Sequence, residues 1–347
     1  MKRALGLMLI VASLVAIVSV VGTATAAPAK KQDTSLTGAG ATFPFPLISK
    51  WIPAVGSAYG INVNYSPIGS GGGIAAITAR TVDFGASDAP LSPNQLDACK
   101  GCVVIPWALS AISIPYNLPG VGCIVRLKES VLASIYLGEI TKWNDPKIAA
   151  NNSKCNLPDM KITPVYRSDN SGSTYAFTDF LSNVSSTWKE KIGTGVSAQW
   201  PAGVGARGSS GVAGVVTKTP GALTYVDIAY SLQNKLRVGW IENKFGKFSS
   251  PGLRGIRAAA SVLPKKINSS EQLKLVDPPK AAGPLAYPIA TFTYVIAPTS
   301  SNKAADLRKF IYWAVTRGQT FGPPLLFQPL PSQVQAYAYR EIKKIQS

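Results

Sequence analysis

Three turns built from glycine and hydroxyl residues constrain the fold of this chain more than any other feature of its sequence. They occupy residues 38–44, 69–73 and 167–173, and each one follows a strand-like segment and precedes a segment with helical periodicity. A further strand-like segment covers residues 82–87. Short strands that alternate with helices predict an α/β architecture, and 347 residues are enough for two ordinary domains or one large one.

The second half of the chain continues this pattern after a long β-rich stretch at 103–116, which is typical of a segment that carries the chain between two lobes. The sequence also predicts helices at 130–137, 173–192 (in two pieces), 302–317 and 331–345, and a buried strand at 287–297. Pro331 suits the first turn of the last helix. Residues 245–284 are rich in Pro, Gly, Ser and Lys, and they give no clear pattern.

The N-terminal segment has the features of a cleaved signal peptide. Lys2 and Arg3 precede an apolar run over residues 4–21, and residues 24–26 form an A-x-A cleavage pattern. The alternative is an uncut membrane anchor, but the run is short for a spanning helix. No cysteine lies near the cut, so a lipoprotein anchor is not indicated. We expect residues 1–26 to be removed on export and the mature protein to be soluble outside the cytoplasm.

The charge and the missing histidines exclude several classes of function. The chain has 35 Lys and Arg against 17 Asp and Glu, a net charge of +18, and loss of Lys2 and Arg3 leaves 18 − 2 = +16. Basic clusters interleaved with aromatic residues are missing, so nucleic-acid binding is not expected. The basic surface either suits its medium or attracts anions. Without histidine, the chain cannot form a Ser-His-Asp triad or a His-ligated metal site.

The four cysteines are predicted to form two disulfides in an exported protein. They are Cys99, Cys102, Cys123 and Cys155. Of three possible connectivities, we favour the pairing of neighbours, Cys99 with Cys102 and Cys123 with Cys155. A redox-active role for the Cys99-Lys100-Gly101-Cys102 motif is the less favoured alternative.

The three turns together have the composition of an anion site. A helix N-terminus exposes amide donors and carries partial positive charge, and glycine lets the backbone approach a ligand closely. Hydroxyls accompany each turn, and Arg167 adds a full charge that can bind two oxygens at once. A single Gly-rich turn is usually only a turn, and none of the three is a P-loop, because no Gly-Lys-Ser/Thr ends the glycine run.

Asp88 is the acidic residue that can select among anions. Phosphate near neutral pH keeps a proton and can donate a hydrogen bond to a carboxylate, whereas sulfate would meet that carboxylate with lone pairs only. Leaving a buried polar contact unmade costs about 1–3 kcal/mol, and more for charged groups. Asp88 could therefore favour phosphate over sulfate and molybdate. The simpler interpretation is a turn or capping residue before Ala89 and Pro90.

Read together and in order, these stretches resemble the PstS family, the phosphate-binding subunit of the bacterial ABC phosphate importer. The matching segments are 36–44, 68–70, 81–91, 136–138, 140–143, 167–173, 193–195, 219–222 and 288–345. The resemblance covers nearly the whole mature chain and is weakest at 241–287. It implies a two-lobed periplasmic-binding-protein fold of type II, each lobe a mixed sheet flanked by helices, with the ligand cleft between the lobes. Residues 34–108 and 288–347 would form lobe I, and residues 109–287 would form lobe II.

The resemblance also implies a set of ligand contacts. Carried over position by position, they are Thr42, Phe43 (through its backbone), Ser70, Asp88, Arg167, Ser171, Gly172 and Ser173. Asp169 matches the residue that pairs with the binding arginine. Ser173 stands where threonine is usual, and Arg207 and Ser209 stand where the family often has lysine and asparagine. The four cysteines are not a general family feature.

The sequence therefore predicts an extracytoplasmic, monomeric binding protein without catalytic residues, cofactor or metal, which captures inorganic phosphate and delivers it to the membrane permease of an ABC importer. Arsenate also carries a proton and remains an alternative ligand. A phosphate sensor or surface protein without transport is a second alternative. A secreted phosphatase is disfavoured, because no histidine is available to activate a serine and no carboxylate cluster suggests two metals.

Overall fold

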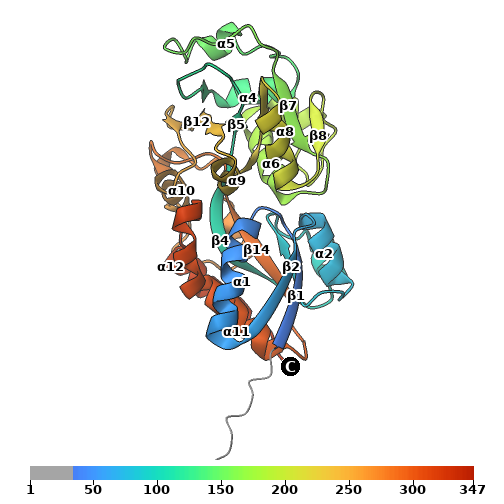
Figure 1. Ribbon diagram of the computed structural model, residues 1–347. Helices are drawn as coiled ribbons and strands as arrows, with labels where there is room; N and C mark the ends of the chain where they lie inside the picture. The colour runs from blue at the N-terminus through green and yellow to red at the C-terminus, as the bar shows by residue number, and fades with distance from the viewer. Residues whose placement is uncertain (1–33) are drawn as a thin grey trace, which may run out of the picture. The chain divides into compact units, whose positions relative to one another are not determined.

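The computed structural model describes residues 34–347, in which helices surround two main β-sheets and a small third one (Figure 1). The predicted signal peptide and its cleavage site lie outside the described residues. Within the described part of the chain, no helix is both long enough and apolar enough to cross a bilayer.

The larger sheet has six strands in the order β10-β4-β14-β3-β1-β2. Their bounds are β1 Thr34–Gly40, β2 Ile61–Ser66, β3 Phe84–Ser87, β4 Cys102–Ser113, β10 Val226–Asp227 and β14 Ala290–Pro298. β1 runs parallel to both β2 and β3, whereas β14 is antiparallel to β3 and β4. The helices that accompany this sheet in Figure 1 are α1 Phe45–Tyr59, α2 Ser70–Thr78, α11 Ala304–Val315 and α12 Ser332–Ile342.

A second sheet has five strands in the order β11-β5-β9-β7-β8. Its strands are β5 Pro115–Tyr116, β7 Thr163–Arg167, β8 Val204–Ala206, β9 Ala222–Thr224 and β11 Arg237–Val238. The helices in this part of the chain are α4 Glu129–Tyr136, α5 Pro146–Ala149, α6 Gly172–Val184, α7 Ser186–Lys191 and α8 Gly208–Lys218. The short helix α9 Ile228–Gln233 contacts β4 and β10 of the larger sheet as well as α8. A small third sheet, ordered β13-β12-β6, contains β6 Arg126–Leu127, β12 Trp240–Glu242 and β13 Phe248–Ser249.

The core of the six-stranded sheet explains why its central strands are almost continuously apolar. β14 is buried along its whole length, since it is covered on both faces, and β4 is buried from its second residue onward. Aromatic side chains fill the space beneath the helices, with Trp51, Trp107, Phe84 and Phe310 in edge or tilted contacts. This rigid sheet fixes the positions at which β1 and β3 end.

Most of the predicted elements are confirmed, with shifts of a few residues at their ends. Residues 173–192 do form two helices, α6 and α7, and the predicted final helix follows Pro331. Residues 245–284, which gave no clear pattern in the sequence, contain one α-helix, α10 Leu253–Ala260, and two short 3₁₀ helices at 270–273 and 280–282. The remaining helical segments are α3 Pro93–Ala98 and 3₁₀ turns at 317–321 and 323–325.

The chain passes from one sheet to the other later than the predicted lobe boundary. β4 stays in the six-stranded sheet through Ser113, where it pairs with β10, and Pro115 begins the strand that belongs to the second sheet. β10 itself comes from the segment assigned to lobe II. The lobe boundaries remain a prediction, but the change of sheet is located at Ile114 rather than at Leu109.

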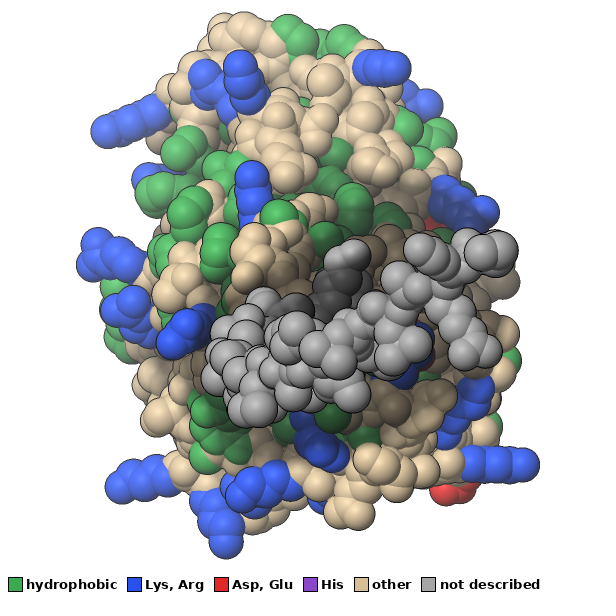
Figure 2. Space-filling model, turned by 60° about the horizontal axis from the view of Figure 1, so that its bottom comes forward, with side chains coloured by type: hydrophobic (Ala, Val, Ile, Leu, Met, Phe, Trp, Pro, Cys, Tyr) green, Lys and Arg blue, Asp and Glu red, His purple; other side chains and the backbone are tan. Residues whose placement is uncertain are grey.

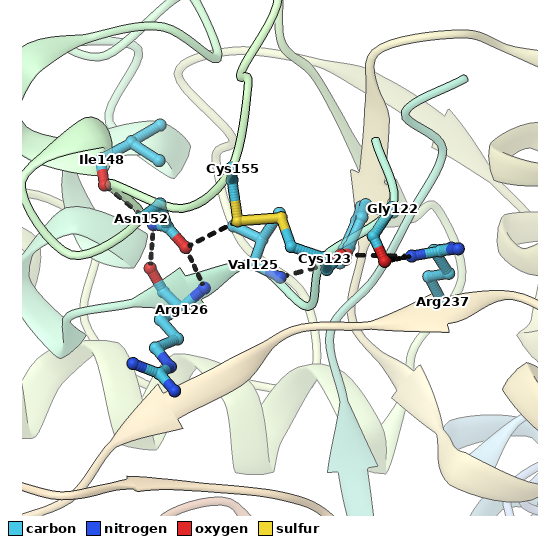
Figure 3. The surroundings of a disulfide bond; sticks show 9 residues. Gly122, Cys123, Val125, Arg126, Ile148, Asn152, Cys155 and Arg237 are labelled. Atoms are coloured by element: carbon cyan, nitrogen blue, oxygen red, sulfur yellow. Dashed lines mark hydrogen bonds between the residues drawn. A yellow bond between two sulfur atoms is a disulfide. The ribbon is translucent and has the colours of Figure 1, made fainter. Parts of the chain in front are cut away.

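Both predicted disulfides are present, Cys99–Cys102 and Cys123–Cys155, and the described residues contain no free cysteine. Figure 3 shows the second of these bonds beside Asn152. The Asn152 amide donates to the carbonyl oxygens of Arg126 and Ile148 and accepts from the Arg126 amide. Asn152 therefore joins the segment around Arg126 to the segment around Ile148 by hydrogen bonds, in addition to the disulfide.

Candidate functional site: an anion-binding pocket

Three of the predicted site segments follow the carboxyl ends of strands, two of them in the six-stranded sheet and one in the five-stranded sheet. β1 and β3 are parallel neighbours, so Thr42 and Asp88 follow carboxyl ends that lie side by side. Arg167 is the last residue of β7 in the second sheet, and α6 begins five residues later. The contacts described below join these segments to one another.

Ser70 links the first residues of α2 and α6. Its Oγ accepts hydrogen bonds from the Gly172 amide at 3.0 Å and from the Asp88 amide at 3.2 Å. Gly172 has no room for a side chain, because a Cβ there would lie 2.7 Å from the Asp88 amide nitrogen. The glycine in this turn is therefore required by the close approach of two backbones. The N-termini of α2 and α6 meet at this contact.

Thr42 is joined to a fourth helix N-terminus, that of α8. The hydroxyls of Thr42 and Ser209 lie 2.7 Å apart, and the Ser209 amide donates to Thr42 Oγ1 at 3.3 Å. Tyr230 donates its hydroxyl proton to the Thr42 carbonyl oxygen at 2.7 Å. The turn before α1 is thus held from the side of the second sheet.

Arg167 is the positive charge of the site and is only 3% exposed. Its Nε and Nη2 donate to the two carboxylate oxygens of Asp169 at 2.7 and 2.5 Å, and its Nη1 donates to Ser209 Oγ at 3.3 Å. Three of the five guanidinium N–H groups are used in these bonds, which leaves 5 − 3 = 2 for an anion. Such a fixed fork is the donor geometry that oxyanions prefer.

Asp169 orients Arg167 and is held in turn by the Gly208 amide, which donates to its Oδ1 at 3.0 Å. Burial alone would raise the pKa of Asp169, but the hydrogen bond and charge of Arg167 bring that pKa below its ordinary value. The carboxylate therefore stays ionised. Its role is to fix the guanidinium, as the resemblance implied.

Asp88 is the unusual group in the site, because it is an acid that is 3% exposed and has no salt-bridge partner among the described residues. The Ser173 hydroxyl lies 3.5 Å from its Oδ2, while its Oδ1 is buried without a hydrogen-bond partner in residues 34–347. Burial raises the pKa of Asp88 to about 7, although Thr293, Arg167, Ser173 and Ser70 each oppose the rise. Buried polar atoms are almost always hydrogen-bonded, so a bound ligand with a donor would complete this site.

The other predicted contacts lie in the same place but differ in what they offer. Phe43 is fully buried against Phe327, with ring centroids 5.9 Å apart, so only its backbone could face a ligand. Ser171 caps α6, since its Oγ accepts from the Thr174 amide at 3.2 Å, and its own amide donates to the Val196 carbonyl. Ser171 could therefore offer an anion its hydroxyl proton.

The predicted ligand contacts do not include Ser209, although the structure brings its side chain to the site. Its Oγ contacts both Thr42 and Arg167. The signal was present: residues 205–211 form a small-residue turn with hydroxyls before a helix, like the three turns that were recognised. Tyr230 and Tyr225, which binds the Arg167 amide through its hydroxyl, left no local signal.

Two cavities border the site from different sides. One of about 530 Å³ is lined by Thr42, Lys50, Arg207, Gly208 and Tyr230 among others, and Lys50 and Arg207 are exposed there. The other, of about 230 Å³, is lined by Asp88, Tyr175, Asp179, Lys274 and Tyr294 among others. In the second cavity, Lys274 is the one Lys or Arg among the lining residues, and it already pairs with Asp179 at 2.9 Å.

Comparison with known proteins places the chain among binding proteins. A family model described as a PBP superfamily domain matches residues 23–317. A phosphate-binding protein PstS from Xylella fastidiosa is 39% identical over 332 residues, covering 92% of this chain and 89% of the relative. One from Methanocaldococcus jannaschii is 34% identical over 341 residues, covering 91% and 87%.

Solved structures agree on the fold. A high-affinity periplasmic phosphate-binding protein, PfluDING, solved with bound phosphate, has a TM-score of 0.70 and 22% identity, and the match covers 88% of this chain and 93% of that one. A phosphate-binding protein from Stenotrophomonas maltophilia has a TM-score of 0.66 and 21% identity, covering 88% and 94%. At this identity the likeness establishes the fold, and it confirms the predicted two-lobed architecture.

Proposed function

The chain belongs to the PstS family of phosphate-binding proteins, and on that premise we propose that it binds inorganic phosphate outside the cytoplasm and delivers it to the permease of an ABC importer. Its relatives are named as solute-binding proteins rather than enzymes. We include in the proposal a cleaved signal peptide at residues 1–26, an extracytoplasmic location and a monomeric state.

The single observation that carries the proposal is that one buried site makes two opposite demands on its ligand, one for hydrogen-bond acceptors and one for a hydrogen-bond donor. Arg167 offers free N–H groups and full positive charge, while Asp88 offers an orphaned acceptor oxygen. An anion satisfies the first, and only an anion that still carries a proton satisfies the second. Phosphate near neutral pH meets both demands. Arsenate meets them as well, and we expect it to compete with phosphate.

We propose that the anion is bound by Thr42, the Phe43 backbone, Ser70, Asp88, Arg167, Ser171, Gly172 and Ser173. Asp169 and Ser209 would act by holding the guanidinium of Arg167 in position for the ligand. Thr42, Phe43, Ser70 and Asp88 come from segments next to the six-stranded sheet, whereas Arg167 ends β7 and residues 171–173 lie at the start of α6. Ligand binding and closure of the two lobes would then be one equilibrium.

The proposal is tested by calorimetric titration of the ligand-stripped mature protein with phosphate, then with sulfate. We expect one phosphate to bind per chain with submillimolar affinity, and sulfate at pH 8 to give no heat above dilution. A folded protein that binds neither anion would contradict the proposal. A protein that binds both equally would retain anion binding but contradict the role assigned to Asp88.

The basic surface leads to a prediction about association rate. Figure 2 shows one face on which Lys and Arg side chains are spread and acidic side chains are scarce. Lys50 and Arg207 line the cavity that leads to Thr42. Changing both to Gln should slow phosphate association severalfold at low salt, and the difference should vanish near 1 M salt because the field is screened. Stopped-flow fluorescence measures the rate, and Lys142 with Lys147 changed to Gln is the control for net charge. Equal slowing in the control would contradict local steering.

A further inference from the structure

The Cys99–Cys102 disulfide has a charged neighbour that the phosphate site does not explain. Arg80 follows α2, and its Nη1 lies 3.2 Å from Cys102 Sγ and 3.5 Å from Cys99 Sγ. The same guanidinium donates to the carbonyl oxygens of Ile77 and Cys99 at 2.8 and 2.7 Å. These bonds hold the cation in place over both sulfur atoms.

A cation in this position favours the reduced form of the pair. A disulfide carries no charge, whereas the thiolate released on reduction does, so a guanidinium at hydrogen-bond distance stabilises the products more than the reactant. A guanidinium is suited to this role because it combines a full positive charge with several N–H donors in a fixed planar geometry. Arg80 touches both sulfurs, so it can stabilise whichever of them leaves.

The two sulfurs differ in access. Cys99 is 1% exposed, whereas Cys102 is only partly buried. An incoming thiolate can therefore reach Cys102 more readily than Cys99, and Cys99 becomes the leaving group.

We propose that Cys99–Cys102 is a thiol–disulfide exchange site, which a dithiol reductant opens with Arg80 stabilising the released thiolate. A thiolate of the dithiol bonds to Cys102 Sγ, the Cys99–Cys102 bond breaks, and its electron pair leaves on Cys99 Sγ. The second thiolate of the dithiol then attacks the sulfur of its own partner and releases Cys102. The dithiol becomes a disulfide, the two cysteines gain its two electrons, and its two protons pass to solvent or to the new thiolates.

The second disulfide provides an internal comparison, because none of the contacts in residues 34–347 places a Lys or Arg donor at its sulfur atoms. Near Cys123–Cys155, Arg237 donates to the carbonyl oxygens of Gly122 and Cys123 (Figure 3). An acceptor oxygen lies near one sulfur of each bond, Cys99 O at 3.6 Å from Cys102 Sγ and Asn152 Oδ1 at 3.9 Å from Cys155 Sγ. The difference between the two bonds is the cation, so Cys123–Cys155 should resist reduction more than Cys99–Cys102 does.

The experiment equilibrates the full mature protein in dithiothreitol buffers of graded reducing strength, traps free thiols by alkylation, and identifies each pair by mass spectrometry. We expect Cys99–Cys102 to open with an equilibrium constant at least tenfold larger than that of Cys123–Cys155, which is a difference of about 30 mV. Equal opening of the two bonds, or earlier opening of Cys123–Cys155, would overturn the proposal.

Variants separate the charge from the simple effect of ring size. Arg80→Gln should make Cys99–Cys102 about tenfold harder to open, and Arg80→Lys should restore part of the loss. Arg237→Gln is the matched control and should leave Cys99–Cys102 unchanged. If Arg80→Gln folds, as judged by circular dichroism, and opens like the parent, the role of Arg80 is wrong. If it does not fold, the rate of wild-type opening with and without 1 M salt tests the same charge, and no salt effect would count against it.

Discussion

Replacing Arg167 with Met is expected to lower phosphate affinity by roughly thirtyfold to a few thousandfold. Arg167 is 3% exposed and supplies the positive charge of the site. Two of its guanidinium N–H groups have no partner among the described residues and can bind the anion. Removing one partner of a buried charge pair costs about 2–5 kcal/mol or more, and each 1.4 kcal/mol is roughly tenfold in affinity. Calorimetry with phosphate measures the loss directly.

The matched control for this prediction is Arg126→Met. Arg126 is exposed and lies over the Phe248 ring, with its guanidinium carbon 5.9 Å from the ring centroid, outside the contacts that form the site. The Arg126→Met substitution removes the same charge from the chain but at a distance from the site, so phosphate affinity should change by less than about twofold. A folded Arg167→Met protein that keeps affinity within tenfold of the parent would show that the anion is bound elsewhere.

A milder change tests the orientation of Arg167. Asp169→Asn removes the carboxylate that fixes Nε and Nη2 but leaves the positive charge in place. Its effect on affinity should therefore be well below that of Arg167→Met, and the two losses should not add in the double variant.

The sequence was sufficient for those parts of the site in which helix, turn and ligand group are neighbours along the chain. Ser70 opens α2, and Gly172 and Ser173 open α6, so a small-residue turn before a helical pattern already places their donors. The pairing of Arg167 with Asp169 is equally local, since the residues are two positions apart. For these residues, local geometry decides the outcome.

Long-range contacts could not be predicted in the same way. Tyr230 binds the Thr42 carbonyl across 188 residues, and nothing in the sequence around Tyr230 distinguishes it from a core tyrosine. The end of β4 is a similar case. Its last residues pair with β10, a two-residue strand that no periodicity reveals, so the sheet extends beyond the predicted boundary. Pairing between distant segments decides both features.

Asp88→Asn is expected to remove the discrimination against sulfate. At pH 8 the amide can donate to a sulfate oxygen, where the carboxylate offers only lone pairs, so sulfate affinity should rise at least tenfold. Phosphate should lose about tenfold, because the amide oxygen still accepts its proton. Titrations with both anions measure the ratio. Asp227→Asn is the matched control, since Asp227 is also a fully buried acid with an unpartnered oxygen in the described chain, and it should leave sulfate excluded.

The pH dependence tests whether the proton of Asp88 is the cause. Burial raises the pKa of Asp88 to about 7, so the ligand-free carboxyl is mostly neutral at pH 5 and mostly charged at pH 8. If sulfate binds only the neutral form, wild-type affinity for sulfate should be about tenfold higher at pH 5, because apparent affinity follows the competent fraction. The Asn variant should bind sulfate equally at both pH values. A wild-type protein whose sulfate affinity does not change would contradict this explanation.

The same raised pKa fixes the sign of a stability effect in the ligand-free protein. A carboxyl whose folded pKa lies above its ordinary value contributes stability that is full below that ordinary value and is lost as pH rises through about 7. Between pH 5 and pH 8 this loss amounts to roughly 2–3 kcal/mol. Thermal unfolding at pH 5 and 8 should therefore show a drop of several degrees that Asp88→Asn reduces. Burial raises the pKa of Asp227 too, so part of the drop should remain until both acids are replaced. If phosphate binding depends on this acid, adding phosphate at pH 8 should restore the wild type more than the variant, since the ligand supplies the donor that the buried oxygen lacks.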